Sequence, residues 1–417
     1  MDSLIIASDD TFGQSMTQTA NFTTMTKVPE LLAPAGSFDK MKVAVKYGAN
    51  AVYLAGQKFG LRSAADNFTL PELKHAVQFA HDHGVKVYIT MNSFLFDDDL
   101  NQIADFIKMI SPLGLDAAIV SDMGIASVLN QNSKIPLHVS TQASVNNAES
   151  AIIWKNLGAT RLIVGREVSI AEAKVIKDKT GLEVEMFIHG SMCMAYSGHC
   201  VISNYTQGRD SNRGGCAHSC RFEYEIETSH GKEKTHFMSS KDLNGLHVLH
   251  EMVEAGIDSI KVEGRMKSEL YAAVTTKSYA SALKIIQRDG ILSEEKYREL
   301  SHDLDKIPHR AYTEASLLKP AGVNSIFDER DGVTKGQGLA GQVILNDENQ
   351  GLYLAVKQSF NKGDTLEFVP FSGSNITYKL DQFFDIAGHC IERSKPSTLI
   401  KLPYVPHVQN LNLVRTI

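Results

Sequence analysis

Residues 30–56 read ELLAPAGSFDKMKVAVKYGANAVYLAG, and this stretch decides the fold. Its first residues form a short apolar run that is typical of a buried strand, and its last residues, AVYLAG, return to the same pattern. Between them, residues 38–48 carry apolar side chains three or four positions apart, as an amphipathic helix does, and end at Gly48. A strand, a helix and a strand in this order predict one unit of a parallel sheet.

The same unit recurs from Glu30 to about residue 288. The predicted strands are 30–36, 51–56, 85–92, 117–122, 136–143, 161–167, 183–190 and 258–265. The predicted helices between them include 38–48, 71–84, 99–110, 124–131, 148–158 and 169–181. Eight such units in about 260 residues match an α/β fold of the closed (β/α)8, TIM-like type. An open, doubly wound parallel sheet is the alternative that periodicity leaves open.

A Cys-rich segment, 191–235, interrupts the alternation directly after the seventh strand, at the rim where barrel active sites lie. A predicted helix, 241–256, follows it. Beyond the barrel we predict a charged helix at 293–307 and then short alternating strands that favour a small all-β barrel or sandwich. The predicted domains are a disordered polar tail at 1–27, the barrel at 28–290, a helix and linker at 291–338, and a small β-barrel at 339–417.

Four of the five cysteines lie close together in this segment, as Cys193, Cys200, Cys216 and Cys220. Their spacing is C-x6-C-x15-C-x3-C. The first 26 residues lack the basic start of a signal peptide, so we expect a cytoplasmic metal or cluster site instead of disulfides. Zinc, an iron-sulfur cluster and unliganded thiols all remain open on spacing alone. We predict that the fifth cysteine, Cys390, is a buried small hydrophobic residue.

Composition excludes several classes of function. The net charge of -6 gives no overall attraction to nucleic acid, so an RNA partner would need a local basic patch. No apolar run is long enough to cross a membrane. The sequence has no phosphate-binding GxxxxGK[ST] loop, no strand-linked GxGxxG, no GxSxG and no HExxH, so it carries no local signature of those enzymes.

Polar residues near the ends of the predicted strands are the catalytic candidates, because a barrel holds such residues at its rim. They are Asn92, His138, Arg166, Glu167, Glu185, His189, Lys261, Glu263 and Arg265. Each one alone could be a capping or surface residue. Together, the cations predict a substrate with carboxylate or phosphate groups.

Basic and aromatic residues surround the last two cysteines and could bind splayed RNA bases. They are Arg209, Arg213, His218, Arg221, Phe222 and Tyr224. Shielding of a cluster and packing of the loop is the equally favoured alternative.

The run EMFIHGSMCMAYSGHCVIS, residues 185–203, resembles the signature of the collagenase-like peptidase family 32, whose mechanism is unassigned. Further matching runs are LLAPAGSFDKMKVAVKYGANAVYLAG, FGLRSAADNF with Arg62, HVSTQ, NRGGCAHSCR, SSKDL and KVEGRMKS. The likeness is close over residues 28–290 and looser beyond. It is greatest to the branch that hydroxylates the wobble uridine of tRNA to 5-hydroxyuridine.

This resemblance implies an RNA-modifying enzyme with tRNA as its partner. It implies a 4Fe-4S cluster on Cys193, Cys200, Cys216 and Cys220, with zinc as the alternative, and prephenate, a small dicarboxylate, as source or trigger of the hydroxyl group. Two other functions remain open. One is a protease, as the family name suggests, and the other is an iron-sulfur accessory or scaffold protein in an RNA or quinone hydroxylation complex. A partner protein or a homo-oligomer is compatible with each.

Overall fold

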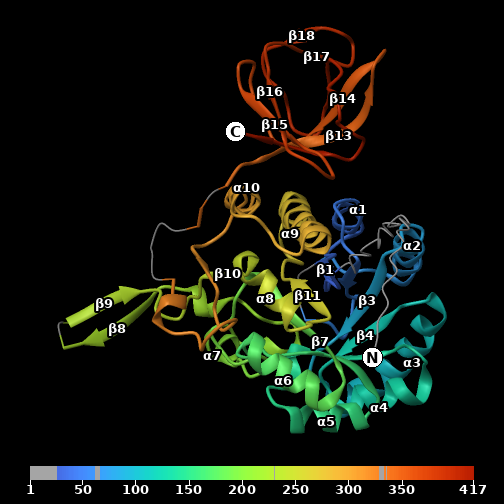
Figure 1. The fold of residues 1–417 in the computed structure, drawn as a ribbon, viewed down its shortest axis with the longest axis vertical. Coiled ribbons are helices and arrows are strands. Elements are labelled where there is room, and N and C mark those ends of the chain that lie inside the picture. Colours follow the sequence, from blue (N-terminus) through green and yellow to red (C-terminus); the bar gives the residue numbers. More distant parts are fainter. Residues whose placement is uncertain (1–25, 62–65, 230, 328–332, 335) are drawn as a thin grey trace, which may run out of the picture.

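The computed structural model describes residues 26–61, 66–229, 231–327, 333–334 and 336–417. Most of the predicted tail 1–27 and the motif residue Arg62 therefore lie outside the described residues. Eight parallel strands form a closed barrel, because β11 pairs with both β1 and β7 (Figure 1). The strands are β1 (Glu30–Pro34), β2 (Ala51–Leu54), β3 (Lys86–Met91), β4 (Ala117–Val120), β5 (Leu137–Val139), β6 (Ala159–Ile163), β7 (Glu183–Ser191) and β11 (Ser259–Val262). The predicted TIM-like barrel is confirmed.

Helices cover the outside of the barrel, as the apolar spacing predicts. They are α1 (Phe38–Lys46), α2 (Leu70–His81), α3 (Asp97–Ile110), α4 (Met123–Asn132), α5 (Ala148–Asn156) and α6 (Ile170–Thr180). Local sequence sets their starts: Thr69 and Glu72 form a reciprocal capping box at α2, and Ser169 and Glu172 form another at α6. Every residue of β2 is buried between these helices and the barrel interior.

The Cys-rich segment leaves the barrel where β7 ends and returns as β10 (Asp242–Asn244), which pairs antiparallel with β7. Between them lie α7 (Ile202–Gln207) and the hairpin β8 (Tyr224–Thr228) and β9 (Gly231–Thr235), which points away from the barrel in Figure 1. The predicted helix 241–256 is therefore wrong at its start. Leu243 pairs with Gly190 in a sheet, and only α8 (Leu249–Glu254), preceded by one 3-10 turn, is helical.

Two helices follow the barrel. The 21-residue α9 (Glu269–Asp289) is absent from the helices predicted above, whereas α10 (Glu294–Asp305) confirms the predicted charged helix. A short strand, β12 (Tyr312–Thr313), then pairs with β10. No helix in the described part of the chain is both long and apolar enough to cross a membrane.

The C-terminal domain is an antiparallel, all-β half-barrel. Its strand order is β16-β15-β20-β13-β14-β19-β17-β18. The bounds are β13 (Leu339–Asp347), β14 (Gly351–Val356), β15 (Thr365–Val369), β16 (Ile376–Lys379), β17 (Phe383–Asp385), β18 (Cys390–Ile391), β19 (Leu399–Leu402) and β20 (Leu413–Thr416). Cys390 is exposed, so the prediction of a buried cysteine is wrong. It lies on β18, a two-residue strand at the edge of the sheet.

Buried charges and one tyrosine join this domain to the barrel helices. Arg415 of β20 is fully buried and forms ion pairs with Asp303 of α10 and Glu367 of β15. Glu367 also accepts a hydrogen bond from Lys306, at 2.8 Å. The Tyr47 hydroxyl donates to the Val369 carbonyl at 2.6 Å and accepts from the Leu413 amide at 3.0 Å. The half-barrel is thus fixed to the outer face of the barrel helices by directional contacts.

Candidate active site at the barrel mouth

Two adjoining cavities lie at the C-terminal end of the barrel strands. The larger, of about 320 Å³, is lined by all four clustered cysteines and is called the cysteine cavity below. The smaller, of about 50 Å³, is the mouth cavity, which is lined by strand-end residues such as Asn92 and Lys261. Leu61, Gln142, Arg166 and Glu263 line both cavities. The cysteines and the barrel mouth therefore belong to one site.

The four thiols lie near one another without forming a site for a single metal ion. Burial raises the pKa of Cys220 to about 11; Arg221 opposes this rise and the other three cysteines add to it. Cys193 is exposed and the other three are half-buried. Among the described residues, no three His, Cys, Asp or Glu side chains are placed to share one metal ion.

Small polar side chains hold the cysteine segment in shape. Ser219 and Ser203 are fully buried; Thr206 donates to the Ser219 hydroxyl at 2.7 Å, and Ser203 accepts from the Ala217 amide at 3.1 Å. The Asn212 amide group donates to the Cys200 carbonyl at 3.0 Å. These contacts hold α7 and the backbone next to Cys200, Cys216 and Cys220 together. The segment therefore has a defined shape around the cysteine cavity.

Gly198 docks the segment onto the barrel rim. Its φ is 82°, and a Cβ there would lie 2.0 Å from the Gln142 carbonyl oxygen. We expect Gly198→Ala to push the backbone between Cys193 and Cys200 off the rim and to speed cleavage of the Cys-rich segment several-fold, as measured by limited proteolysis. Gly208→Ala is the matched control, since Gly208 also has a positive φ, of 61°, but open space around it. Equal rates of cleavage in both variants would contradict this role of Gly198.

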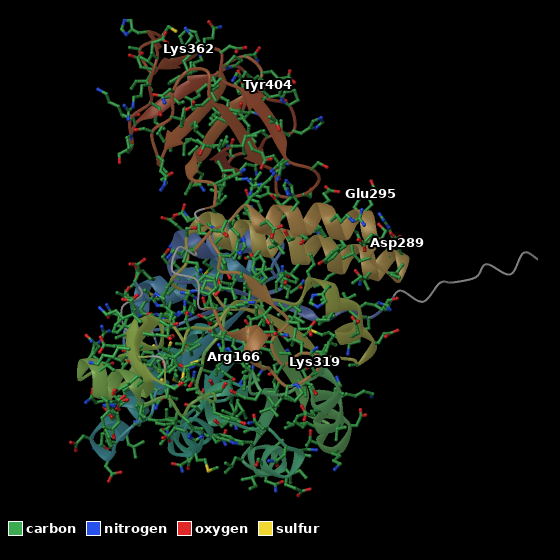
Figure 2. The ribbon with its side chains drawn as sticks, turned by 90° about the vertical axis from the view of Figure 1, so that its left-hand side faces the viewer. Arg166, Asp289, Glu295, Lys319, Lys362 and Tyr404 are labelled. Carbon is green, nitrogen blue, oxygen red and sulfur yellow. The ribbon has the colours of Figure 1, made fainter. Side chains whose placement is uncertain are left out.

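Five of the nine predicted catalytic residues line the site. They are Asn92, Arg166, Lys261, Glu263 and Arg265. Figure 2 labels Arg166 in the barrel domain. Its guanidinium lies over the Phe187 ring at 4.0 Å, and its buried Nε has no hydrogen-bond partner among the described residues. Arg166 is therefore a cation held in place and ready for an anionic ligand.

The other lining residues are held by neighbours. The Tyr53 hydroxyl donates to Glu263 Oε2 at 3.3 Å, and Asn92 Nδ2 donates to the Ser140 hydroxyl at 3.3 Å. Arg265 Nη1 donates to the Leu61 carbonyl at 3.0 Å. Such contacts fix the orientation of the side chains before a ligand binds.

The remaining predicted residues line neither cavity. Glu185 and His138 lie inside the barrel, where Glu185 is fully buried and pairs with Lys261 at 3.1 Å and with Arg161 at 3.3 Å. Burial, with Arg161 nearby, lowers the pKa of His138 well below its ordinary value. These two residues therefore lie in the barrel interior, below its mouth.

His189 and Glu167 also have structural surroundings. His189 is buried among Tyr271, Tyr279 and Tyr312, and burial lowers its pKa to about 3, so it is neutral at physiological pH. Glu167 Oε1 accepts a hydrogen bond from the Ser197 amide at 3.0 Å. Glu167 thus fastens the cysteine segment beside Gly198.

Two cations of the cysteine cavity were missed by the sequence reasoning. Lys267 follows β11 inside the motif KVEGRMKS, which was a usable signal, whereas Arg310 lies far along the chain, beyond α10, and had none. With Arg166 and Arg221 they make four cations, and Glu263 is the one acidic residue among the described residues that line either cavity. The site favours anionic groups.

The structure places the six residues proposed to bind RNA in different surroundings. His218 and Arg221 line the cysteine cavity, and Arg209 is exposed. Arg213 pairs with Asp99 at 2.8 Å and lies over the Phe96 ring. Phe222 and Tyr224 lie farther along the segment, where Phe222 is 39% exposed and the Tyr224 hydroxyl donates to the Ser219 carbonyl.

Comparison with known proteins places the chain in a family. Residues 36–326 match Peptidase family U32, and residues 335–415 match the Peptidase family U32 C-terminal domain. The chain is 36% identical to tRNA hydroxylation protein P1 of Bacillus subtilis, over 94% of this chain and 95% of that protein.

Two other relatives show the breadth of the family. The chain is 33% identical to the 23S rRNA 5-hydroxycytidine C2501 synthase of Escherichia coli, over 81% of this chain and 52% of that protein. It is 28% identical to a collagenase of Porphyromonas gingivalis, over 69% of this chain and 73% of that protein. The two family matches together span the barrel and the half-barrel, and the Bacillus subtilis relative is similar over nearly its whole length. This chain therefore belongs to Peptidase family U32.

Proposed function

We propose that this protein is an RNA-modifying enzyme that hydroxylates tRNA, with the wobble uridine as its target and 5-hydroxyuridine as its product. The names of the relatives similar over most of this chain support tRNA hydroxylation. The observation that carries the proposal is the continuity of the two cavities: the four cysteines share Arg166 and Glu263 with the barrel mouth. A metal group and a bound nucleotide base would therefore meet in one site.

The cysteine cavity carries the ligand set of an iron-sulfur cluster. Four thiols line one cavity of about 320 Å³, and four thiolates complete a cubane cluster; a zinc ion is the alternative ligand. A cluster on four thiolates is anionic, and Arg221, Lys267 and Arg310 would offset that charge. Cys193, Cys200, Cys216 and Cys220 would hold a 4Fe-4S cluster, which supplies one-electron transfer when bound.

The mouth cavity offers groups for a uracil edge and for a carboxylate. Glu263, oriented by Tyr53, can accept a hydrogen bond from the N3–H of uracil, and the amides of Asn92 and Gln142 can donate to its carbonyl oxygens. Arg166 has donor capacity left for a carboxylate of a small dicarboxylate such as prephenate. Lys261, whose ammonium group donates to Glu185, adds positive charge to the lining of the mouth cavity.

Two other functions are less well supported by the site. A peptidase is suggested by the family name and by the collagenase relative, but cations and clustered thiols suit an anionic ligand and a metal group better than a peptide. An accessory role in a hydroxylation complex predicts that the purified single chain is inactive. Hydroxylation of tRNA by the cluster-loaded chain with its co-substrate would therefore exclude the accessory role.

A deletion strain tests the proposed function. We expect tRNA from cells that lack this protein to lose its 5-hydroxyuridine-derived nucleosides in mass spectrometry, and the wild-type chain to restore them. Arg166→Ala should lower the rate about 10-fold to 100-fold, since it removes a charged hydrogen-bond donor. Arg298→Ala is the matched control, because Arg298 is exposed on α10 and pairs with Glu294. Full modification in the deletion strain would exclude the proposal.

A further inference from the structure

Large apolar side chains are exposed beside the cysteine cavity, within one short stretch of the chain. Met194, Tyr196, Val201 and Tyr205 are 47%, 64%, 54% and 88% exposed. These four residues are called the tyrosine platform below. Contiguous exposed apolar patches typically mark interaction surfaces, and these four exposed side chains lie within twelve positions of the chain.

The platform is held outward by a rigid support. Tyr196 lines the cysteine cavity and is followed by Ser197, whose amide donates to Glu167. Tyr205 lies on α7 between Ser203 and Thr206, and both of these form the buried hydrogen bonds that fix this helix. Tyr205 is therefore exposed on a fixed helix, so the backbone that carries its ring needs little further ordering when a partner binds.

Charge around the platform favours an anionic partner. Residues 186–209 contain no Asp or Glu, although the whole chain has a net charge of -6. The exposed Arg209 ends this stretch, and Arg166 and Arg221 lie at the cavity side. The nearest acid along the chain, Asp210, already accepts the Asn212 amide at 3.0 Å. The exposed acids Asp97 and Asp98 lie on another element, at the start of α3.

We propose that the tyrosine platform stacks the unpaired bases that flank the target nucleotide of a single-stranded RNA loop, Tyr196 beside the cavity and Tyr205 farther out. This inference rests on the proposed function and names the part of the RNA that the site takes. Aromatic rings next to cations hold splayed bases, because every base offers a flat face and every phosphate a negative charge. A paired helix keeps its bases stacked inside and cannot use such a platform.

Binding of a fluorescent anticodon stem-loop RNA to the cluster-loaded, full-length protein, followed by anisotropy, tests the platform. We expect Tyr205→Ala to weaken this binding about 5-fold to 150-fold, the range typical of loss of one base–aromatic stack. Tyr205→Phe should bind as the wild type does, because the ring is retained. Tyr404→Ala is the matched control: Tyr404 is exposed on the half-barrel, away from Arg166 in Figure 2, and should leave the affinity unchanged.

Two further measurements separate the possible failures. A blunt RNA duplex of equal length should bind the wild type and Tyr205→Ala equally, and equal loss for both RNAs would overturn base stacking. Light scattering should give the same mass for the wild type and for Tyr205→Ala. If Tyr205→Ala instead dissociates an oligomer, the platform is an interface between protein chains. If RNA binding depends on Tyr205 but no tRNA is hydroxylated, the platform stands and the proposed function fails. If hydroxylation proceeds with an unchanged KM in Tyr205→Ala, the platform fails alone.

Discussion

The proposed 4Fe-4S cluster predicts that the anaerobically purified protein is brown, and that replacing any one of Cys193, Cys200, Cys216 and Cys220 by alanine removes this absorbance and reduces tRNA hydroxylation to background. Each thiol lines the same cavity, and a cubane held by four thiolates loses its stability when one corner is open. The effect should be the largest of any single substitution in the site. Visible absorption, with iron and sulfide analysis of the same samples, measures it.

The fifth cysteine supplies the control for this experiment. Cys390 is exposed on the edge strand β18 of the other domain, so Cys390→Ala should keep the full iron content and activity. Stoichiometric zinc in place of iron in the wild type would contradict the cluster. Iron retained in all four single variants would show that these thiols are not its ligands.

Arg415→Met is expected to destabilise the half-barrel by about 3–5 kcal/mol, the cost typical of breaking a buried ion pair on one side. Arg415 is fully buried, and its loss leaves the nearly buried carboxylates of Asp303 and Glu367 short of a cation. Lys306 still pairs with Glu367, so most of the free-energy cost comes from Asp303, which loses the cation it was paired with. Urea unfolding, followed by fluorescence and by proteolysis of the half-barrel, measures the change.

The matched control is Arg393→Met, an exposed arginine of the same domain, which should change the unfolding free energy by about 0.5 kcal/mol or less. The double variant Arg415→Met with Asp303→Asn should recover part of the loss, because it removes the carboxylate left behind. No difference between Arg415→Met and Arg393→Met would show that the buried charges do not hold the domains together.

The barrel was predictable because its signals are local and repeated. Each strand of the β/α units has its own apolar run, each helix its own spacing and cap, and Thr69 with Glu72 shows how few residues set a helix start. The cysteines were predictable as a set because they lie close along the chain. Strands such as β17 and β20, with three or four residues and no distinct pattern, gave no comparable signal.

Depth within the barrel was not predictable from the sequence. Successive strand residues point alternately to the interior and outward, so two interior residues only two positions apart can lie one at the mouth and one in the buried layer below. Glu185 and Glu263 therefore look alike in the sequence, yet Glu185 pairs with Lys261 and Arg161 inside the barrel, while Glu263 lines both cavities. Arg310 reaches the site only because β12 pairs with β10, a contact between distant segments.

The pairing of β10 with β7 has a consequence for maturation. Ser191 and Asp242 are partners in this pairing, so the segment that carries the four thiols leaves the sheet and returns to it at the same point. The barrel closes without this segment, through the pairing of β11 with β7. The newly made chain can therefore complete its hydrophobic core before this segment takes up any ligand, and the proposed cluster would enter last. On this proposal, protein without the cluster stays folded, and starvation for iron stops the reaction without unfolding the chain.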